Sequence, residues 1–216
     1  MNLTSIAGVI PQKNIWVISP HFDDVVLTVG GYLDSLVRAG RLDTKAVRVI
    51  HVFSRSNYQA RDPEGNRDTS LARVQMATGI RLLEDLNCLD DLLGHGRYDY
   101  ELKAERECVV RLKGWKPGEA FEFPQGNRAT FDREDREIFE RVKQYSAGWL
   151  SQEDTALLVP LGVKEHVDHI IVREAILEAG DEMGRAARSA LYFGEDQPYT
   201  GLADANDRQV ADAFIS

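Results

Sequence analysis

One stretch near the start of the chain reads Ile15-Trp16-Val17-Ile18-Ser19-Pro20-His21-Phe22-Asp23-Asp24. Its first four residues form a short apolar run, which is typical of a buried strand. Apolar residues then recur at helical spacing over residues 25–39, and Gly40 supplies a stop signal for that helix. We therefore expect His21, Asp23 and Asp24 at the carboxyl end of a strand, where a helix begins. Ligand sites in open α/β sheets gather at that edge.

A second stretch far downstream repeats this arrangement. Residues 156–161 form another strand-like run, and His166-Val167-Asp168-His169 opens a segment with helical spacing up to Ala179. The two clusters of His and Asp are expected to meet across a parallel sheet. Imidazole and carboxylate groups are ordinary zinc ligands, and His21 and Asp24, three residues apart, can point the same way. Two His and one Asp around Zn²⁺ leave a fourth position for water, which marks a catalytic metal site.

These motifs resemble those of the PIG-L or LmbE-like deacetylases, zinc enzymes that remove an acetyl group from N-acetylglucosamine-type substrates. The family motif (A/S)HPDDE or PHPDD corresponds to residues 19–25, and the motif HPDH or HxDH corresponds to residues 166–169. A weaker likeness to the family run Y-x-E-D-x-P-Y covers residues 191–199. The three motifs lie in family order, and the resemblance spans roughly residues 15–199. Phe22 and Val25 depart from the family pattern, which has Pro and Glu at these positions.

Site roles follow from the residues and the resemblance together. We take His21, Asp24 and His169 as the Zn²⁺ ligands, and the resemblance assigns Asp23 the role of general base. His166 is expected to stabilise the oxyanion as a charged imidazolium. Asp168 would orient it and raise its pKa above the usual ~6.5.

An arginine completes the expected site. Family members carry an arginine near the start of the helix that follows the second strand, and Arg73 corresponds to it as a substrate-binding residue. The alternative is that Arg73 only solvates an exposed helix face.

The implied reaction is hydrolysis of an N-acetyl or other N-acyl group on a small amino-sugar conjugate. One alternative is a metal-dependent phosphoesterase with two metal ions, although the sequence shows no obvious supply of further ligands to bridge them. Another is a non-catalytic sugar-binding module, which would be favoured by loss of the base, whereas Asp23 is present. The number of metal ions per chain would distinguish the two enzymes.

Composition limits the remaining classes. The length of 216 residues predicts a single domain over residues 1–216, with an irregular, Gly-, Pro- and aromatic-rich insertion around residues 114–131. A net charge of −9 argues against nucleic-acid binding, which needs a basic face. Cys88 and Cys108 have no C-x-x-C spacing and predict neither a metal knuckle nor a disulfide framework. With neither a signal-peptide pattern nor an apolar run of membrane length, a cytoplasmic location is expected. Self-association into a homo-oligomer stays an open alternative.

The rest of the chain alternates strand-like and helix-like segments, which predicts an α/β, Rossmann-like fold with a mainly parallel sheet and helices on both faces. The loop over residues 54–68 carries three arginines and is expected to cover the metal and become ordered when substrate binds; the alternative is a solvated loop whose arginines have no specific role. His51 is expected to be a satisfied core residue. His95 is expected to be a turn residue, with a position facing the cleft as the alternative. The further expected elements are strands at 46–53, 87–93 and 190–193, and helices at 70–83, 101–113, 132–149 and 204–214.

Overall fold

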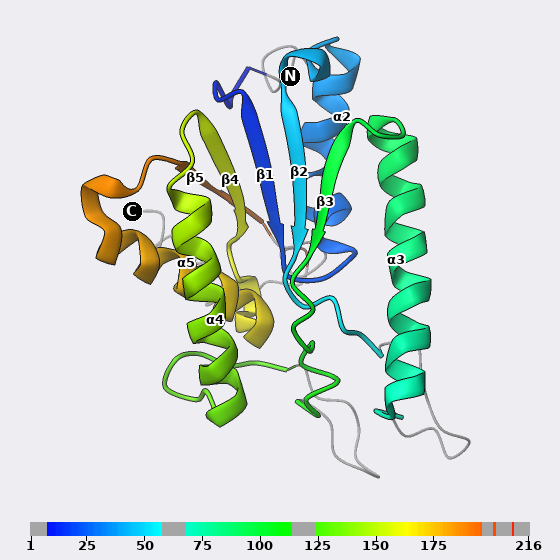
Figure 1. Cartoon of the computed structure of the whole chain (residues 1–216), viewed down its shortest axis with the longest axis vertical. Helices are drawn as coiled ribbons and strands as arrows, with labels where there is room; N and C mark the ends of the chain where they lie inside the picture. The colour runs from blue at the N-terminus through cyan, green and yellow to red at the C-terminus, as the bar shows by residue number, and fades with distance from the viewer. Residues whose placement is uncertain (1–7, 58–67, 114–123, 196–200, 202–208, 210–216) are drawn as a thin grey trace.

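The fold is described from a computed structural model, which describes residues 8–57, 68–113, 124–195, 201 and 209. The described residues contain a five-stranded sheet in which all paired strands are parallel, in the order β3-β2-β1-β4-β5 (Figure 1). The strands are β1 (Asn14–Ser19), β2 (Ala46–His51), β3 (Tyr98–Leu102), β4 (Thr155–Pro160) and β5 (Ala190–Gly194). This sheet confirms the α/β, Rossmann-like class.

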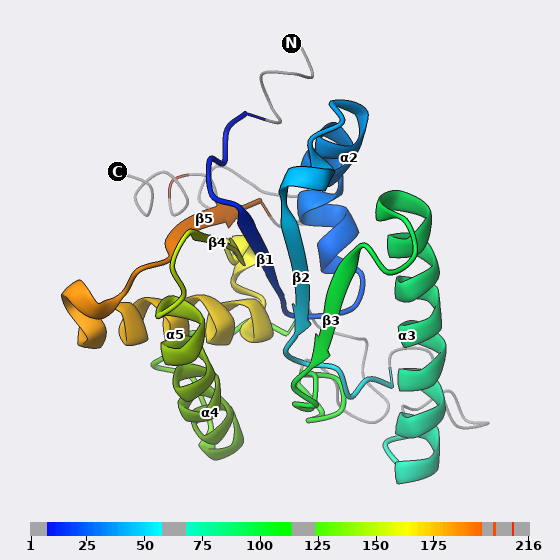
Figure 2. The same ribbon diagram turned by 45° about the horizontal axis from the view of Figure 1, so that its top comes forward.

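Helices cover both faces of the sheet, as Figure 2 shows most clearly. One pair consists of α2 (Gly30–Arg38) and α3 (Leu71–Leu93), and the other consists of α4 (Arg133–Leu150) and α5 (Val167–Met183). The alternation of side chains along the strands builds a core on each side. In β1, Ile15 and Val17 pack in the cluster that includes α2 and α3, whereas Ile18 packs with α4 and α5.

The strand order reverses between β1 and β4, and this reversal positions the two motifs. β1 pairs with β2 on one side and with β4 on the other. The chain first builds outward from β1 to β3 and then crosses to β4 by way of α4. The loops after β1 and β4 therefore leave the same edge of the sheet next to each other. In an open α/β sheet, this switch point is where ligands bind.

Two expected elements are wrong. Residues 87–93 are not a strand, because α3 continues through them to Leu93 and ends before Gly94, which has a φ of 93°. Residues 101–113 are not a helix: Glu101 and Leu102 end β3, and the segment from Lys103 to Lys113 follows as irregular chain with an isolated bridge at Arg106 and then turns.

The other expected elements are found close to their expected places, except that residues 58–67 of the loop, residues 114–123 of the insertion and all of the closing helix but Gln209 lie outside the described residues. Within the described ranges, none of the helices combines the length and apolar character needed to cross a membrane.

Candidate metal centre

The first motif lies in the turn that follows β1. His21 and Asp24 are buried there, just before a π-helical segment, Val25–Val29, that leads into α2. π-Helical turns are rare and occur frequently at functional sites. The turn is fixed by its own hydrogen bonds, since the His21 backbone N–H donates to Asp24 Oδ2 at 2.9 Å and the Ser19 hydroxyl donates to the His21 carbonyl at 2.6 Å.

The second motif begins α5 after a tight turn from β4. Gly162 takes a left-handed conformation, with a φ of 78°, in which a Cβ would also lie 2.8 Å from Ile170 Cδ1. Glycine is therefore the residue that fits this turn. Residues 124–126, in the described part of the predicted insertion, are hydrogen-bonded to the second motif and the turn before it. The Val167 N–H donates to the Pro124 carbonyl and the Gly126 N–H donates to the Glu165 carbonyl, both at 2.9 Å.

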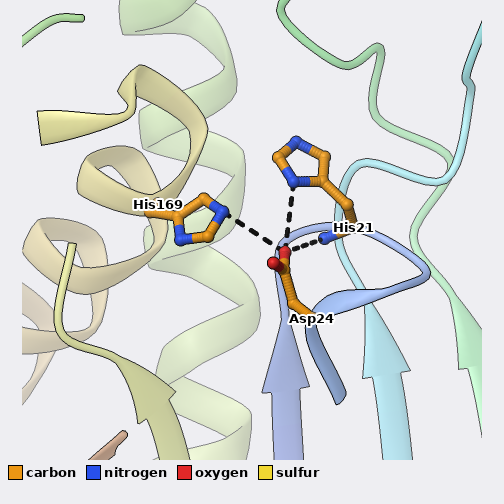
Figure 3. Close-up of side chains that lie close together, drawn as sticks. All are labelled: His21, Asp24 and His169. Carbon is orange, nitrogen blue, oxygen red and sulfur yellow. Dashed lines mark hydrogen bonds and ion pairs between the residues drawn. The ribbon is translucent and has the colours of Figure 1, made fainter. Parts of the chain in front are cut away.

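The structure brings the three predicted metal ligands together. Asp24 Oδ2 lies 3.1 Å from His21 Nδ1 and 3.2 Å from His169 Nε2 (Figure 3). Donor atoms about 2.1 Å from a tetrahedral zinc ion are separated by about 3.4 Å, so these spacings suit three ligands of one ion. All three side chains are buried, and together they form a group that could hold a metal ion.

The charges of the centre also suit a cation. Burial opposes ionisation of Asp24, but His169 and His21 outweigh it and hold the pKa of this carboxyl well below its usual range. Burial likewise opposes ionisation of His21, but hydrogen bonds to Asp168 and Asp24 raise its pKa to about 9. The ionised carboxylates at the centre thus favour a positive charge between the two motifs, which a metal ion can supply.

His166 lies in the cluster, but its electrostatics differ from the expectation. Its ring centroid is 4.8 Å from that of His169 and 5.1 Å from that of His21. Burial, together with these two histidines, lowers the pKa of His166 well below its usual value, and Asp168 does not compensate. The predicted rise in this pKa is wrong. The imidazole is neutral near neutral pH and can act as a hydrogen-bond donor without a charge.

Asp168 contacts a different histidine from the expected one. Its Oδ2 lies 2.8 Å from His21 Nε2, and its Oδ1 accepts a 2.7 Å hydrogen bond from Arg111 Nη2. The segment from Lys103 to Lys113 therefore contributes to the centre. The sequence offered a weak signal for Arg111, since Val109 and Val110 precede it in an otherwise charged segment.

Asp23 is placed differently from its neighbour Asp24. Its side chain is 62% exposed, and Oδ1 accepts a 2.8 Å hydrogen bond from Arg81 Nη2. It lines a pocket of about 310 Å³ between the first motif and α3. The other lining residues are Phe22, Val26, Leu27, Arg81, Glu84, Asp85 and Cys88. The three donor residues are not among the lining residues, so Asp23 connects this pocket to the metal centre as the chain neighbour of Asp24.

Among the described residues, Arg81 is the arginine that contacts the side chain of Asp23 in the first motif. Arg73 lies in the first turns of α3, is half exposed and pairs with Asp68 at 3.4 Å, so its substrate-binding role stays a prediction. Arg81 is buried and contacts Asp23 and Glu107. A signal for it was present in the sequence, because Val74, Ala77 and Arg81 follow one another at helical spacing on the buried side of α3.

The two positions that depart from the motif pattern, Phe22 and Val25, are both buried in the core. Val25 is fully buried and packs in the core beneath α2. Phe22 is buried against His51, with the ring centroids 5.0 Å apart. His51 is the satisfied core histidine that was expected, since its Nε2 lies 3.0 Å from Asp85 Oδ2. His95 is exposed, pairs with Asp90 and precedes β3, so it lies at the opposite edge of the sheet from the centre.

The two cysteines give a direct check of this arrangement. Cys88 is exposed, whereas Cys108 is buried with its Sγ 3.7 Å from His166 Nε2. Burial, with Asp168 and Glu107 nearby, raises the pKa of the Cys108 thiol well above its usual value. We expect iodoacetamide at pH 8 to alkylate Cys88 alone in the native protein and both cysteines after denaturation, as read by peptide mass spectrometry. Rapid native alkylation of Cys108 would contradict the described packing.

The chain thus combines a parallel α/β sheet with a His and Asp cluster at its switch point, and several solved structures are similar to it in fold. A teicoplanin deacetylase, Orf2, in a zinc-inhibited form, is 22% identical, with a TM-score of 0.61 over 87% of this chain and 69% of its own. The A40926 pseudoaglycone deacetylase Dbv21 is 21% identical, with a TM-score of 0.58 over 89% and 67%. The N,N'-diacetylchitobiose deacetylase from Pyrococcus horikoshii is 14% identical, with a TM-score of 0.53 over 99% and 71%.

These likenesses confirm the fold. No protein-family model matches the chain, and no curated protein sequence matches it.

Proposed function

We propose that this chain is a zinc-dependent hydrolase that removes an N-acetyl or other N-acyl group from a small amino-sugar conjugate. One observation carries the proposal: His21, Asp24 and His169 converge as a buried donor set, while the adjacent Asp23 faces a pocket. The fold shared with several deacetylases supports it. The proposed setting is the cytoplasm, because Cys88 and Cys108 are both free thiols, as is usual in a reducing compartment.

His21, Asp24 and His169 would hold the zinc ion, which when bound would supply a Lewis acid to lower the pKa of a water molecule and polarise the amide carbonyl. Asp23 accepts a proton from the attacking water and then donates it to the leaving amine. The contact with Arg81 holds the Asp23 carboxylate in place during both transfers. His166 donates a hydrogen bond from a neutral imidazole to the oxygen that becomes negative.

A two-metal phosphoesterase is the alternative that the site disfavours. His21, His166 and Asp168 form a second possible ligand group in the described part of the chain, but this group shares His21 with the first. Both oxygens of Asp168 also accept hydrogen bonds, from Arg111 Nη2 and from the Cys108 backbone N–H. A non-catalytic sugar-binding module would give Asp23 no role at the pocket.

The proposed function is tested by measuring acetate release from a panel of N-acetylated sugars and sugar conjugates. The zinc-loaded protein is expected to release acetate with at least one of them, and the same protein treated with a chelator is expected to be inactive until zinc is restored. Phosphate esters serve as the control panel. Turnover of phosphate esters with two metal ions per chain, and none of amides, would overturn the proposal.

His166→Ala is expected to retain zinc and lower kcat by about 10²–10³-fold, the usual cost of losing one donor to an oxyanion. His166→Gln should recover part of this loss, because a neutral amide N–H can replace a neutral imidazole N–H. The measurements are zinc content and kcat for both variants. Loss of zinc from His166→Ala would instead make His166 a ligand.

A further inference from the structure

The His21 ring lies between two carboxylates. Its Nδ1 is 3.1 Å from Asp24 Oδ2, and its Nε2 is 2.8 Å from Asp168 Oδ2. Only one of these nitrogens can face the metal position, and it is Nδ1, because Asp24 Oδ2 also lies next to His169 Nε2. Nε2 points away from that position toward Asp168. Ligating histidines commonly donate the second ring N–H to a carboxylate, which fixes the tautomer and the ring orientation.

We propose that Asp168 is the positioning residue of His21, and that Arg111 acts on His21 through Asp168. The chain of contacts from Arg111 through Asp168 to His21 is called the relay below. Asp168 accepts the Nε2–H of His21 and thereby leaves the Nδ1 lone pair for the metal. Arg111 fixes the carboxylate that does this. The inference deepens the function proposed above and rests on its zinc site.

Asp168 is held too firmly to turn toward another partner. Its Oδ1 accepts a 2.7 Å hydrogen bond from Arg111 Nη2, and its Oδ2 accepts one of 2.8 Å from the Cys108 backbone N–H. The side chains of Asp168 and Arg111 are both fully buried. Arg111 is fixed in turn by Asp135 of α4 at 3.2 Å and by the ring of Phe53, whose centroid is 5.2 Å from its Cζ.

Electrostatics add to this geometry. Asp168 Oδ1 accepts a hydrogen bond from the Arg111 guanidinium, a cation that favours the carboxylate form, so Asp168 faces His21 as a charged acceptor. A charged acceptor makes the hydrogen bond from Nε2–H stronger than a neutral one would, and it raises the basicity of the ligating nitrogen.

The relay joins segments that are far apart in the sequence. Arg111 comes from the turns after β3, Asp168 comes from the first turn of α5, and His21 comes from the turn after β1. A metal ligand on one motif is thus oriented by the other motif and by a third segment. The same contact explains why an aspartate precedes His169, although it contributes no ligand atom to the group formed by His21, Asp24 and His169.

The first test is a measurement on the unsubstituted, zinc-loaded protein. ¹⁵N NMR of the histidine side chains is expected to show His21 with a protonated Nε2 and a metal-bound Nδ1, with the Nε2 proton protected from exchange. A spectrum with the metal on His21 Nε2 would overturn the inference. No substituted protein is needed for this reading, so it does not depend on whether a variant folds.

Zinc affinity, measured by competition with a chromophoric chelator, gives the second reading. Asp168→Asn and Arg111→Met are expected to weaken zinc binding about 10–100-fold, as is typical when an outer partner of a ligand is removed. Arg111→Lys should weaken it less. The control is Arg141→Met, which removes a similar contact to Glu105, 2.8 Å from each of two guanidinium nitrogens, outside the histidine cluster. Wild-type affinity in a folded Asp168→Asn would overturn the inference.

Neither reading requires a substrate. If zinc binds as expected but no amide is hydrolysed, the proposed function fails and the relay stands. If amides are hydrolysed while His21 binds zinc through Nε2, the proposed function stands and the relay fails.

Discussion

Asp23→Asn is expected to lower kcat by about 10²–10⁴-fold while the protein keeps its zinc. Asparagine has the shape of aspartate but cannot accept a proton near neutral pH. Its amide oxygen can still accept the hydrogen bond that Arg81 Nη2 donates at 2.8 Å, so the local geometry should be preserved. Because Asp23 is not among the grouped ligand atoms, metal content should be unchanged.

The measurements are kcat and zinc content of the purified variant. Asp34→Asn provides the matched control, since it makes the same chemical change on the exposed side of α2, where Asp34 pairs only with Arg38 among the described contacts. Near-normal turnover by Asp23→Asn with intact zinc would remove Asp23 from the mechanism. Loss of zinc would show that this side chain turns inward and becomes a ligand.

The first motif could be predicted well from sequence because local and tertiary signals agree there. A strand-like run, a polar turn and a helical period follow one another within residues 15–38, and each leaves its own pattern. The second motif has the same local form. That the two meet depends on β1 pairing with β4, which follows from the general rule for parallel sheets.

The middle of the chain was less predictable because its local signals are ambiguous. The run at residues 87–93 contains Asn, Cys and two Asp, which are modest helix formers, yet Leu89 and Leu93 continue the buried side of α3. β3 lies at the edge of the sheet and has the sequence Tyr98-Asp99-Tyr100-Glu101-Leu102. Its acidic residues alternate with tyrosine and leucine, the period of two that is typical of a strand with two different faces.

The segment from Lys103 to Lys113 could not be placed from its own pattern. Its charges resemble a helix with pairs three and four residues apart, but their partners are distant in the chain. Glu105 pairs with Arg141, Glu107 with Arg81, and Arg111 with Asp168. Ion pairs between residues that are distant in the chain leave no periodic pattern in the sequence. The relay from Arg111 through Asp168 to His21 could therefore be found only in the three-dimensional structure.

His169→Ala is expected to abolish tight zinc binding, and activity with it. The loss should exceed the roughly 10–100-fold effect of removing an outer partner such as Asp168, because a ligand atom itself is removed and only two of three remain. Alanine is the best helix former, so the first turn of α5 should stay intact. Zinc content after dialysis and chelator competition measure the effect, while circular dichroism checks the fold.

His95→Ala is the matched control for this substitution. It removes an exposed imidazole that pairs with Asp90 at 3.0 Å, at the opposite edge of the sheet from the metal centre. It should leave both zinc and turnover unchanged. The order of zinc affinities should therefore be wild type and His95→Ala, then Asp168→Asn, then His169→Ala. If His169→Ala keeps zinc as tightly as the wild type, the ion is held elsewhere, and the second possible group of His21, His166 and Asp168 becomes the site to test.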